Sequence, residues 1–306
     1  MQIRYLPNKK IDRTAWDTCI REAVNGRIYA YSWYLDQTAS HWDALVAGNY
    51  EAVFPLPWNA KLGGIKQIYH PYFSQQLGLF YKEAPFGELL PDFLDAIPKK
   101  FRFITLALNE ANKPNSAHWH IQEKTNYLLD LDKSVEEIRA GYSKSLRKRV
   151  RKAAESLQFI SDAKDLENFV GRYHQHLKST FELNSQAYKE ARQLLNLIHK
   201  KEQGTLFRVD DPTGKSLGEI FLPRSHNRLY YLMGYATLEG KQQNSTHFLL
   251  DQIFQYYAQQ DLIFDFEGSS IPNIASFFAS FGAEKVSYPA IQLDRLPRAL
   301  SWLKDR

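Results

Sequence analysis

The chain has 306 residues, 44% of them apolar and 24% charged, and a formal net charge of +5, as in an ordinary soluble globular protein long enough for two domains. Its one cysteine, Cys19, excludes an internal disulfide framework or a thiolate metal cluster. No early apolar run resembles a signal peptide and no 18-residue apolar window occurs, so we expect a cytoplasmic protein with no membrane span.

The first part of the chain predicts a mixed α/β unit. Two alternating apolar runs within 42–58 flank the turn pair Gly48-Asn49, which predicts a β-hairpin. The other predicted elements are a strand at 2–6, helices at 11–24 and 29–38, two strands within 65–81, a helix at 86–97, a strand at 101–108, a polar loop at 109–116 and the last strands within 117–131.

The second part predicts a similar order of elements. It starts with helices at 134–140, 144–157, 163–181 and 186–201, and continues with strands at 204–210, 216–223 and 228–236. A helix at 245–260, capped by Asn244 or Ser245, is followed by a strand at 262–266, a helix at 271–281, a strand at 283–293 and a closing helix at 296–306. The repeated order predicts an internal duplication.

The most charged stretch is "YSKSLRKRVRKA" (142–153), which holds six basic residues and no acidic one. The rest of the chain carries a net charge of −1, whereas a protein that coats nucleic acid spreads positive charge over a broad face. The sequence therefore disfavours general DNA binding. A role for this segment in RNA binding stays open as one of the alternatives.

Helical periodicity makes this stretch amphipathic. Its apolar face comprises Leu146, Val150, Ala153, Ala154 and Leu157, and its basic face comprises Lys144, Arg147, Lys148, Arg151 and Lys152. Like charges at i,i+4 repel one another by a few tenths of a kcal/mol. Two interpretations remain, a solvated face and an anion-binding face, and in the second Arg147, Lys148 and Arg151 hold the anion.

Two carboxylates end a predicted buried strand in "LIFDFEGSS" (262–270). Alternation places Asp265 and Glu267 on the same side of that strand, just before a helix. Ligands of α/β folds bind at this kind of place, so the pair is a candidate general base or amine-binding site. A structural salt bridge, to Lys285 or to the basic helix, is the alternative.

A second candidate site lies on the neighbouring predicted strands. Glu219 stands between apolar residues, so it is either paired or has a raised pKa. Tyr231 and Tyr235 on the next strand are candidate proton donors. The loop 237–247 leads into a helix N-terminus, where Lys241 and Ser245 are candidate ligands for phosphate; an ordinary turn is the alternative.

The nine histidines show no metal-binding spacing, and no nucleophile elbow or phosphate-binding glycine loop occurs. We therefore expect neither a metal site nor covalent catalysis.

Three segments together resemble the FemABX-like proteins, which are double-domain members of the GNAT (acyl-CoA N-acyltransferase) fold. They are "NYLLDLDKSVEEIRAGYSKSLRKRVRKAAE" (126–155), "YLMGYA" (231–236) and "FDFEGSSIPNIASFFASFGAEKV" (264–286). The resemblance implies an α/β (α+β) protein of two tandem GNAT-like domains, with mixed, mostly antiparallel sheets flanked by helices. It implies a degenerate N-terminal domain at 1–125 and a C-terminal domain, similar to FemAB and BioF2-like acetyltransferases, at 126–306, with the last helix packed back on the first domain.

The same resemblance implies a bacterial transferase that moves an acyl or aminoacyl group from acyl-CoA or aminoacyl-tRNA to an amine acceptor, such as a cell-envelope precursor. It implies no tightly bound cofactor, and no oligomeric state follows from it. Glu219 would be the base or amine anchor, with Asp265 and Glu267 as alternatives.

Two departures from the family pattern bear on the donor. Phe278 stands where the tRNA-using members have a lysine, which disfavours tRNA, and 237–247 lacks the Q/R-x-x-G-x-G/A pattern of ordinary CoA-binding members. A non-catalytic ligand-binding protein on the GNAT fold, or an RNA-binding protein that uses 144–152, remains an alternative.

Overall fold

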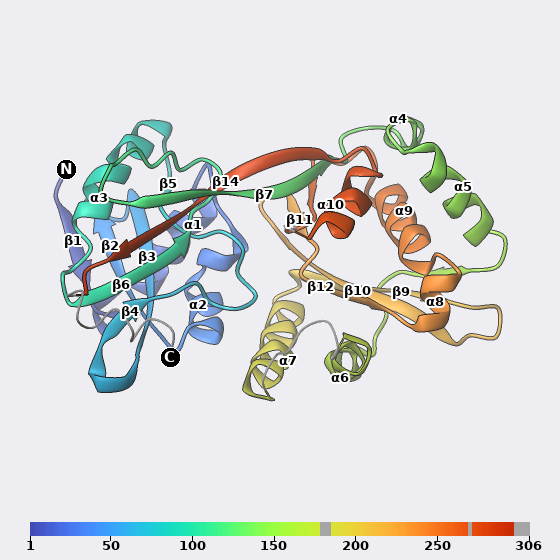
Figure 1. Cartoon of the computed structure of the whole chain (residues 1–306), viewed down its shortest axis with the longest axis horizontal. Helices are drawn as coiled ribbons and strands as arrows, with labels where there is room; N and C mark the ends of the chain where they lie inside the picture. The colour runs from blue at the N-terminus through green and yellow to red at the C-terminus, as the bar shows by residue number, and fades with distance from the viewer. Residues whose placement is uncertain (178–184, 269–270, 297–306) are drawn as a thin grey trace. The chain divides into compact units, whose positions relative to one another are not determined.

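The computed structural model describes residues 1–177, 185–268 and 271–296 (Figure 1). The chain forms two compact units. Unit 1 comprises Met1–Lys124 and Ser287–Arg306, and unit 2 comprises Thr125–Val286. The predicted closing helix and the end of the predicted helix at 163–181 lie outside the described residues.

Unit 1 is built on a mixed sheet with helices around it. Its strands are β1 (Ile3–Leu6), β2 (His41–Ala47), β3 (Ala52–Ala60), β4 (Lys66–Ile68), β5 (Phe80–Tyr81), β6 (Phe101–Ala107) and the last residues of β14 (Glu284–Asp294). Its helices are α1 (Arg13–Glu22), α2 (Ser32–Thr38) and α3 (Leu90–Asp95), with short 3-10 helices η1 (Asn8–Lys10), η2 (Ile28–Ala30), η3 (Leu62–Gly64) and η4 (Ala84–Leu89).

The sheet of unit 1 runs in the order β1-β2-β3-β4-β6-β14, and β5 pairs with β3. Only the β4–β6 pair among these is parallel. The predicted hairpin is β2 and β3, whose register runs from Ala47↔Ala52 to His41↔Trp58. At its turn Gly48 has a φ of +55°, a left-handed conformation that favours glycine.

The strands of unit 2 pair in the order β7-β13-β11-β10-β9-β8, with β12 also paired to β10, and the pairing is mixed because β11 and β13 are parallel. The strands are β7 (His120–Asp130), β8 (Gln158–Ile160), β9 (Gly204–Asp210), β10 (Ser216–Ser225), β11 (Arg228–Tyr230), β12 (Met233–Ala236) and β13 (Ile263–Asp265). The helices are α4 (Val135–Ala140), α5 (Lys144–Ala153), α6 (Leu166–Leu177), α7 (Ser185–Lys200), α8 (Leu238–Gln242), α9 (Ser245–Tyr257) and α10 (Pro272–Ala279).

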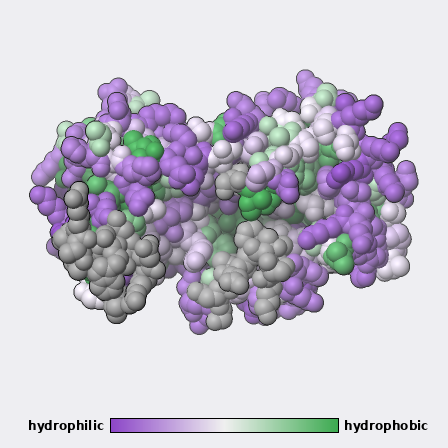
Figure 2. Space-filling model, in the orientation of Figure 1, coloured by the Kyte–Doolittle hydropathy of each residue, from purple (hydrophilic) through white to green (hydrophobic). Residues whose placement is uncertain are grey.

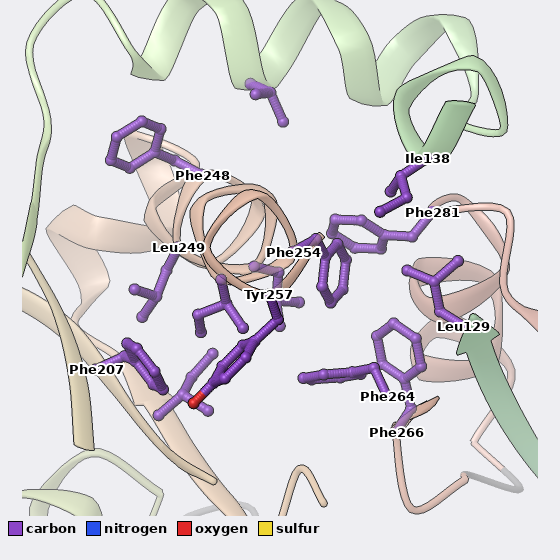
Figure 3. Close-up of a cluster of buried hydrophobic side chains, with 14 of the residues drawn as sticks. Leu129, Ile138, Phe207, Phe248, Leu249, Phe254, Tyr257, Phe264, Phe266 and Phe281 are labelled. Atoms are coloured by element: carbon purple, nitrogen blue, oxygen red, sulfur yellow. The ribbon is translucent and has the colours of Figure 1, made fainter. Parts of the chain in front are cut away.

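Helices cover both faces of the unit 2 sheet (Figure 1). One hydrophobic cluster joins α4, α5, α9 and α10 to one face, and α9 lies at its centre (Figure 3). There Phe254 packs edge-on against Phe264 and Phe281. Each fully buried Phe contributes roughly 1.5–3 kcal/mol, so α9 anchors this layer. On the other face, α6 packs on the sheet through Phe169, whose ring lies 6.5 Å from that of Phe221.

The basic stretch forms α5, as predicted. Ser143 caps the helix by accepting a hydrogen bond from the Leu146 N–H group. Leu146, Val150 and Ala153 are buried, and the basic side chains face outward. Figure 2 shows hydrophilic residues crowding the surface in this region.

Two expectations about local structure are wrong. The predicted strand 228–236 is divided into β11 and β12, because its first half also pairs with β13. The predicted loop 237–247 contains α8. The N-cap residue of α9 is Asn244, one of the two residues predicted, in a left-handed conformation with φ +59°; its side chain makes no capping hydrogen bond, and Ser245 is already helical.

Among the described residues, no helix is long and apolar enough to cross a bilayer.

Candidate active site

Glu219 is the centre of a buried polar cluster in unit 2. Its side chain is 1% exposed, although it stands mid-strand in β10 between the core residues Gly218 and Ile220. Arg172 of α6 donates two hydrogen bonds to it, Nε to Oε2 and Nη2 to Oε1, both of 2.8 Å. The Tyr235 hydroxyl donates a third, 2.7 Å long, to Oε2. The sequence predicted that Glu219 is either paired or has a raised pKa, and the structure shows that it is paired.

Strand alternation decides which layer this cluster faces. Glu219 and Tyr235 are register partners on β10 and β12, so their side chains lie on the same face of the sheet. That face is covered by α6, which supplies Arg172 and packs Phe169 6.1 Å from the Tyr235 ring. The neighbouring Ile220 points into the hydrophobic cluster on the opposite face.

Arg172 connects the buried carboxylate to the start of its own helix. Besides Glu219 it binds Asp165, with 2.5 Å from Nη1 to Oδ2 and 3.1 Å from Nη2 to the carbonyl oxygen. A buried carboxylate that lacks such a partner is strongly destabilising. Glu219 is therefore held in an ion pair, which suits it to positioning neighbouring groups better than to accepting a proton itself.

His176 lies against this cluster, one helical turn after Arg172. Its ring stacks on that of Tyr235, with centroids 4.9 Å apart and an interplanar angle of 9°. Burial lowers the pKa of His176, the charge of Lys241 lowers it further, and Glu219 acts in the opposite direction. The imidazole is consequently neutral near pH 7 and able to accept a proton.

Tyr235 stays protonated in this setting. Burial raises the pKa of its hydroxyl, and the charge and hydrogen bond of Glu219 add to that effect. Because the one phenolic proton is donated to Glu219, Tyr235 holds the His176 ring and the carboxylate in place.

The start of α9 lies next to the strands of this cluster. Ser245 is 0% exposed, and its hydroxyl has no hydrogen-bond partner among the described residues. A Cβ on Gly240 of α8 would lie 2.6 Å from that hydroxyl and 2.2 Å from the Leu217 carbonyl oxygen, so only glycine fits between α8 and β10. None of the hydrogen bonds described for the chain uses the backbone N–H groups of residues 245–247. Such open N–H groups at a helix N-terminus attract anions.

Tyr231 occupies the break between β11 and β12. Its N–H group donates to the Asp265 carbonyl oxygen, 2.8 Å away, and its ring packs against Phe264 and Phe278. A Cβ on Gly234 would lie 2.6 Å from this ring, so glycine lets the ring rest on β12. Burial raises the pKa of the Tyr231 hydroxyl. The described contacts do not bring Tyr231 to Glu219.

The predicted pairing of Asp265 and Glu267 on one strand face is wrong. Strand β13 ends at Asp265, and Glu267 has a φ of +56°, so alternation does not extend to it. Asp265 is 1% exposed and accepts hydrogen bonds from Arg228 (2.6 Å), Asn126 (2.9 Å) and the Glu267 N–H group (2.8 Å). These bonds tie β7, β11 and β13 together. Asp265 is thus in a structural salt bridge, but its partner is Arg228 and not Lys285 or the basic helix, the two predicted partners.

The basic face of α5 belongs to the other layer of unit 2. Arg147 and Arg151 line a cavity of about 310 Å³ together with Tyr142 and Arg139, which is paired with the buried Asp251. Glu219 faces α6 across the sheet. The structure thus does not bring Arg147, Lys148 and Arg151 to the Glu219 cluster.

Sequence reasoning missed Arg172, His176 and Arg228. The first two stand four residues apart on one predicted helix, a spacing that places them on the same face, but nothing in the sequence points that face at β10. Within the described residues, no group of three His, Cys, Asp or Glu side chains is arranged to hold a metal ion.

No protein-family model matches the sequence, and no curated protein matches it. In structure the chain is similar to FemX over 100% of both chains, with a TM-score of 0.73 and 14% identity. It is also similar to the C-terminal DUF2156 domain of a protein assigned as a lysylphosphatidylglycerol synthetase from Agrobacterium fabrum, with a TM-score of 0.58, 12% identity and coverage of 96% and 94%. L-PGS from Bacillus licheniformis gives a TM-score of 0.52 at 13% identity, with coverage of 86% and 88%. These likenesses confirm the predicted fold, that of the FemABX-like proteins, with mixed sheets flanked by helices.

Proposed function

We propose that unit 2 transfers an acyl or aminoacyl group from an activated donor to an amine acceptor. The fold shared with FemX and with a protein assigned as a lysylphosphatidylglycerol synthetase, whose name denotes an aminoacylated lipid product, supports this class of reaction. The observation that carries the proposal is the buried Glu219–Arg172–Tyr235 cluster, with the neutral imidazole of His176 stacked on it.

His176 is the proton carrier in this proposal. The amine nitrogen attacks the carbonyl carbon of the donor and forms the new C–N bond, while its proton passes to the imidazole. The imidazolium then returns that proton to the departing sulfur or oxygen as the C–S or C–O bond breaks. Glu219 opposes the factors that lower the His176 pKa and so stabilises the imidazolium between these two steps.

Arg172, Tyr235 and Glu219 are positioning residues. The bidentate ion pair fixes α6 to β10, and the phenol fixes the stacked ring of His176. Orientation of this kind lowers the barrier because the reacting groups need not be ordered in each turnover.

The anionic part of the donor lies at the start of α9 in this proposal. The N–H groups of residues 245–247, the partnerless hydroxyl of Ser245 and the ammonium of Lys241 are the donors available there. Both acyl-CoA, through its pyrophosphate, and aminoacyl-tRNA, through its terminal phosphates, present such a group.

A thermal-shift panel with acetyl-CoA, a longer acyl-CoA and an aminoacyl-tRNA tests the donor class. A ligand that binds only the folded protein at 100 times its dissociation constant stabilises it by about 2.7 kcal/mol. Product formation with a set of primary amines, followed by mass spectrometry, then tests transfer. Stabilisation by a donor without any transfer product would assign the chain to ligand binding instead.

The matched control is His174→Gln. His174 is on the same helix, but its ring packs against Tyr188 of α7, 4.0 Å away, and not against Tyr235. We expect His176→Gln to slow transfer strongly while donor binding persists, and His174→Gln to preserve both.

A further inference from the structure

A cavity of about 510 Å³ opens on unit 1, and the proposed reaction uses none of its residues. Three segments line it: residues 7–10 around η1, residues 36 and 39–43 from α2 through the start of β2, and Trp58 in β3. Its volume lies within the range of small-molecule sites. Three aromatic side chains line it, those of His41, Trp42 and Trp58.

Trp58 is a half-buried residue of this lining. Its register partner His41, on β2, stacks on it with ring centroids 4.6 Å apart. Lys66 of β4 places its ammonium 4.3 Å from the ring centroid. Cross-strand neighbours on both sides therefore hold the indole in a fixed orientation.

The indole N–H group of Trp58 is buried and has no acceptor among the described residues. An unsatisfied buried donor costs about 1–3 kcal/mol, and native proteins seldom keep one unless something else satisfies it. Trp42, in contrast, donates its N–H group to Asp36 over 2.7 Å. The two indoles of the cavity thus differ, because only the N–H group of Trp58 lacks an acceptor among the described residues.

The carboxylates of the lining already have partners. Asp36 also binds Arg13 at 3.1 Å, and Asp43 accepts from the Asn8 N–H group at 3.0 Å and from Lys100 at 3.4 Å. Lys9 and Lys10 are exposed, and no ion pair is described for either within residues 1–177, 185–268 and 271–296. The groups left to interact are therefore hydrogen-bond donors and positive charges beside aromatic rings.

We propose that this cavity binds an anion carried on a flat ring, as in a nucleotide or an aromatic carboxylate. The ring packs against His41 and Trp58, an acceptor atom of the ligand takes the Trp58 N–H hydrogen bond, and the anionic group is held by Lys9 and Lys10. This site is separate from the proposed transfer reaction of unit 2 and makes no use of its residues.

Calorimetric titration of the full chain tests the proposal with adenosine 5′-monophosphate and indole-3-carboxylate as probes. Adenosine, indole and inorganic phosphate are the partial probes. We expect one of the two complete probes to bind at least tenfold more tightly than its parts, because ring and anion are held together. The probe that binds identifies the source of the ligand, and the absence of binding by both at millimolar concentration overturns the proposal.

The variant Trp58→Phe tests the contribution of the N–H hydrogen bond separately from that of the aromatic ring. Phenylalanine keeps an aromatic side chain and removes the N–H group, so we expect affinity to fall about tenfold while the melting temperature stays level or rises. A purely structural indole would instead lower the melting temperature without affecting the probe. Unchanged affinity in this variant, at unchanged stability, would contradict the assignment of the N–H group.

The double variant Lys9→Gln/Lys10→Gln tests the charges. We expect its affinity for the probe to fall about tenfold and to lose most of its salt dependence. Lys99→Gln/Lys113→Gln is the matched control, because both lysines are exposed on unit 1 and outside the lining. Equal losses of affinity in the two double variants would show that only the net charge of the protein matters, and would overturn the proposed site.

Discussion

Glu219 and Tyr235 face each other across β10 and β12, and the phenol donates a 2.7 Å hydrogen bond to the fully buried carboxylate. The same carboxylate receives both arms of Arg172. One acidic side chain thereby ties a strand pair to a helix, and the His176 ring stacks on the phenol that belongs to this cluster.

The ion pair predicts an asymmetric effect on stability. Arg172→Ala leaves Glu219 buried without a cation and should lower the free energy of unfolding by about 3–5 kcal/mol. Glu219→Gln should cost less, because the Arg172 side chain is 27% exposed and water can solvate it. Urea denaturation measures both. The surface pair Lys215–Glu239 is the control, where Lys215→Ala should cost under about 1 kcal/mol.

His176→Gln should lower the turnover number by about 10²–10⁴-fold, the range for loss of a general acid–base group. The melting temperature should change little, because the imidazole is only partly buried. Steady-state kinetics and thermal unfolding check the two halves of this prediction. Retention of turnover would remove His176 from the mechanism, whatever its effect on folding.

The pH dependence of transfer should follow the His176 pKa, which burial lowers most and the charge of Lys241 lowers further. The proton-accepting form of His176 is the neutral one, so activity should rise as the pH rises through its lowered pKa, below 6.5. Lys241→Gln removes a charge that lowers this pKa, so the rising limb should move to higher pH. Nuclear magnetic resonance titration of the imidazole and the pH–rate profile measure the shift. Lys144→Gln, on α5, should leave both unchanged.

His70 predicts a loss of stability in mild acid. Burial lowers its pKa to about 4, and its ring accepts from the Ala107 N–H group and bonds the Ser74 carbonyl oxygen. In the unfolded chain the His70 imidazole binds a proton near pH 6.5, so between pH 6.5 and 4 unfolding takes up a proton. The free energy of unfolding therefore decreases as the pH is lowered through this range, by up to about 3 kcal/mol. Urea denaturation at a series of pH values measures this. His70→Gln should flatten the slope, and an unaltered slope would contradict the assignment.

The basic face of α5 should matter only for large polyanionic donors. It lies on the sheet face opposite Glu219, so Arg147→Gln/Arg151→Gln should leave transfer from a short acyl-CoA unchanged. Were aminoacyl-tRNA the donor, its KM should rise and its salt dependence should weaken in this variant. An equal loss with both donors would place these arginines at the reacting groups.

The sequence predicted elements whose signal is local. The β2–β3 hairpin follows from two alternating runs around Gly48, and α5 from its apolar stripe opposite six basic residues. Glu219 stood out because a carboxylate among apolar strand residues must find a partner. In each case neighbours within a few residues of the chain carry the information.

Only the tertiary structure identified the partners. The predicted single strand 228–236 divides because both of its parts pair with β10 but only the first also pairs with β13, and Glu267 lies beyond the end of β13 at Asp265. Arg172 and Arg228 lie 47 and 37 residues from the carboxylates they bind. Periodicity fixes which face a side chain occupies, but the element that covers the face is set by packing between distant segments, and that packing decides the chemistry of the site.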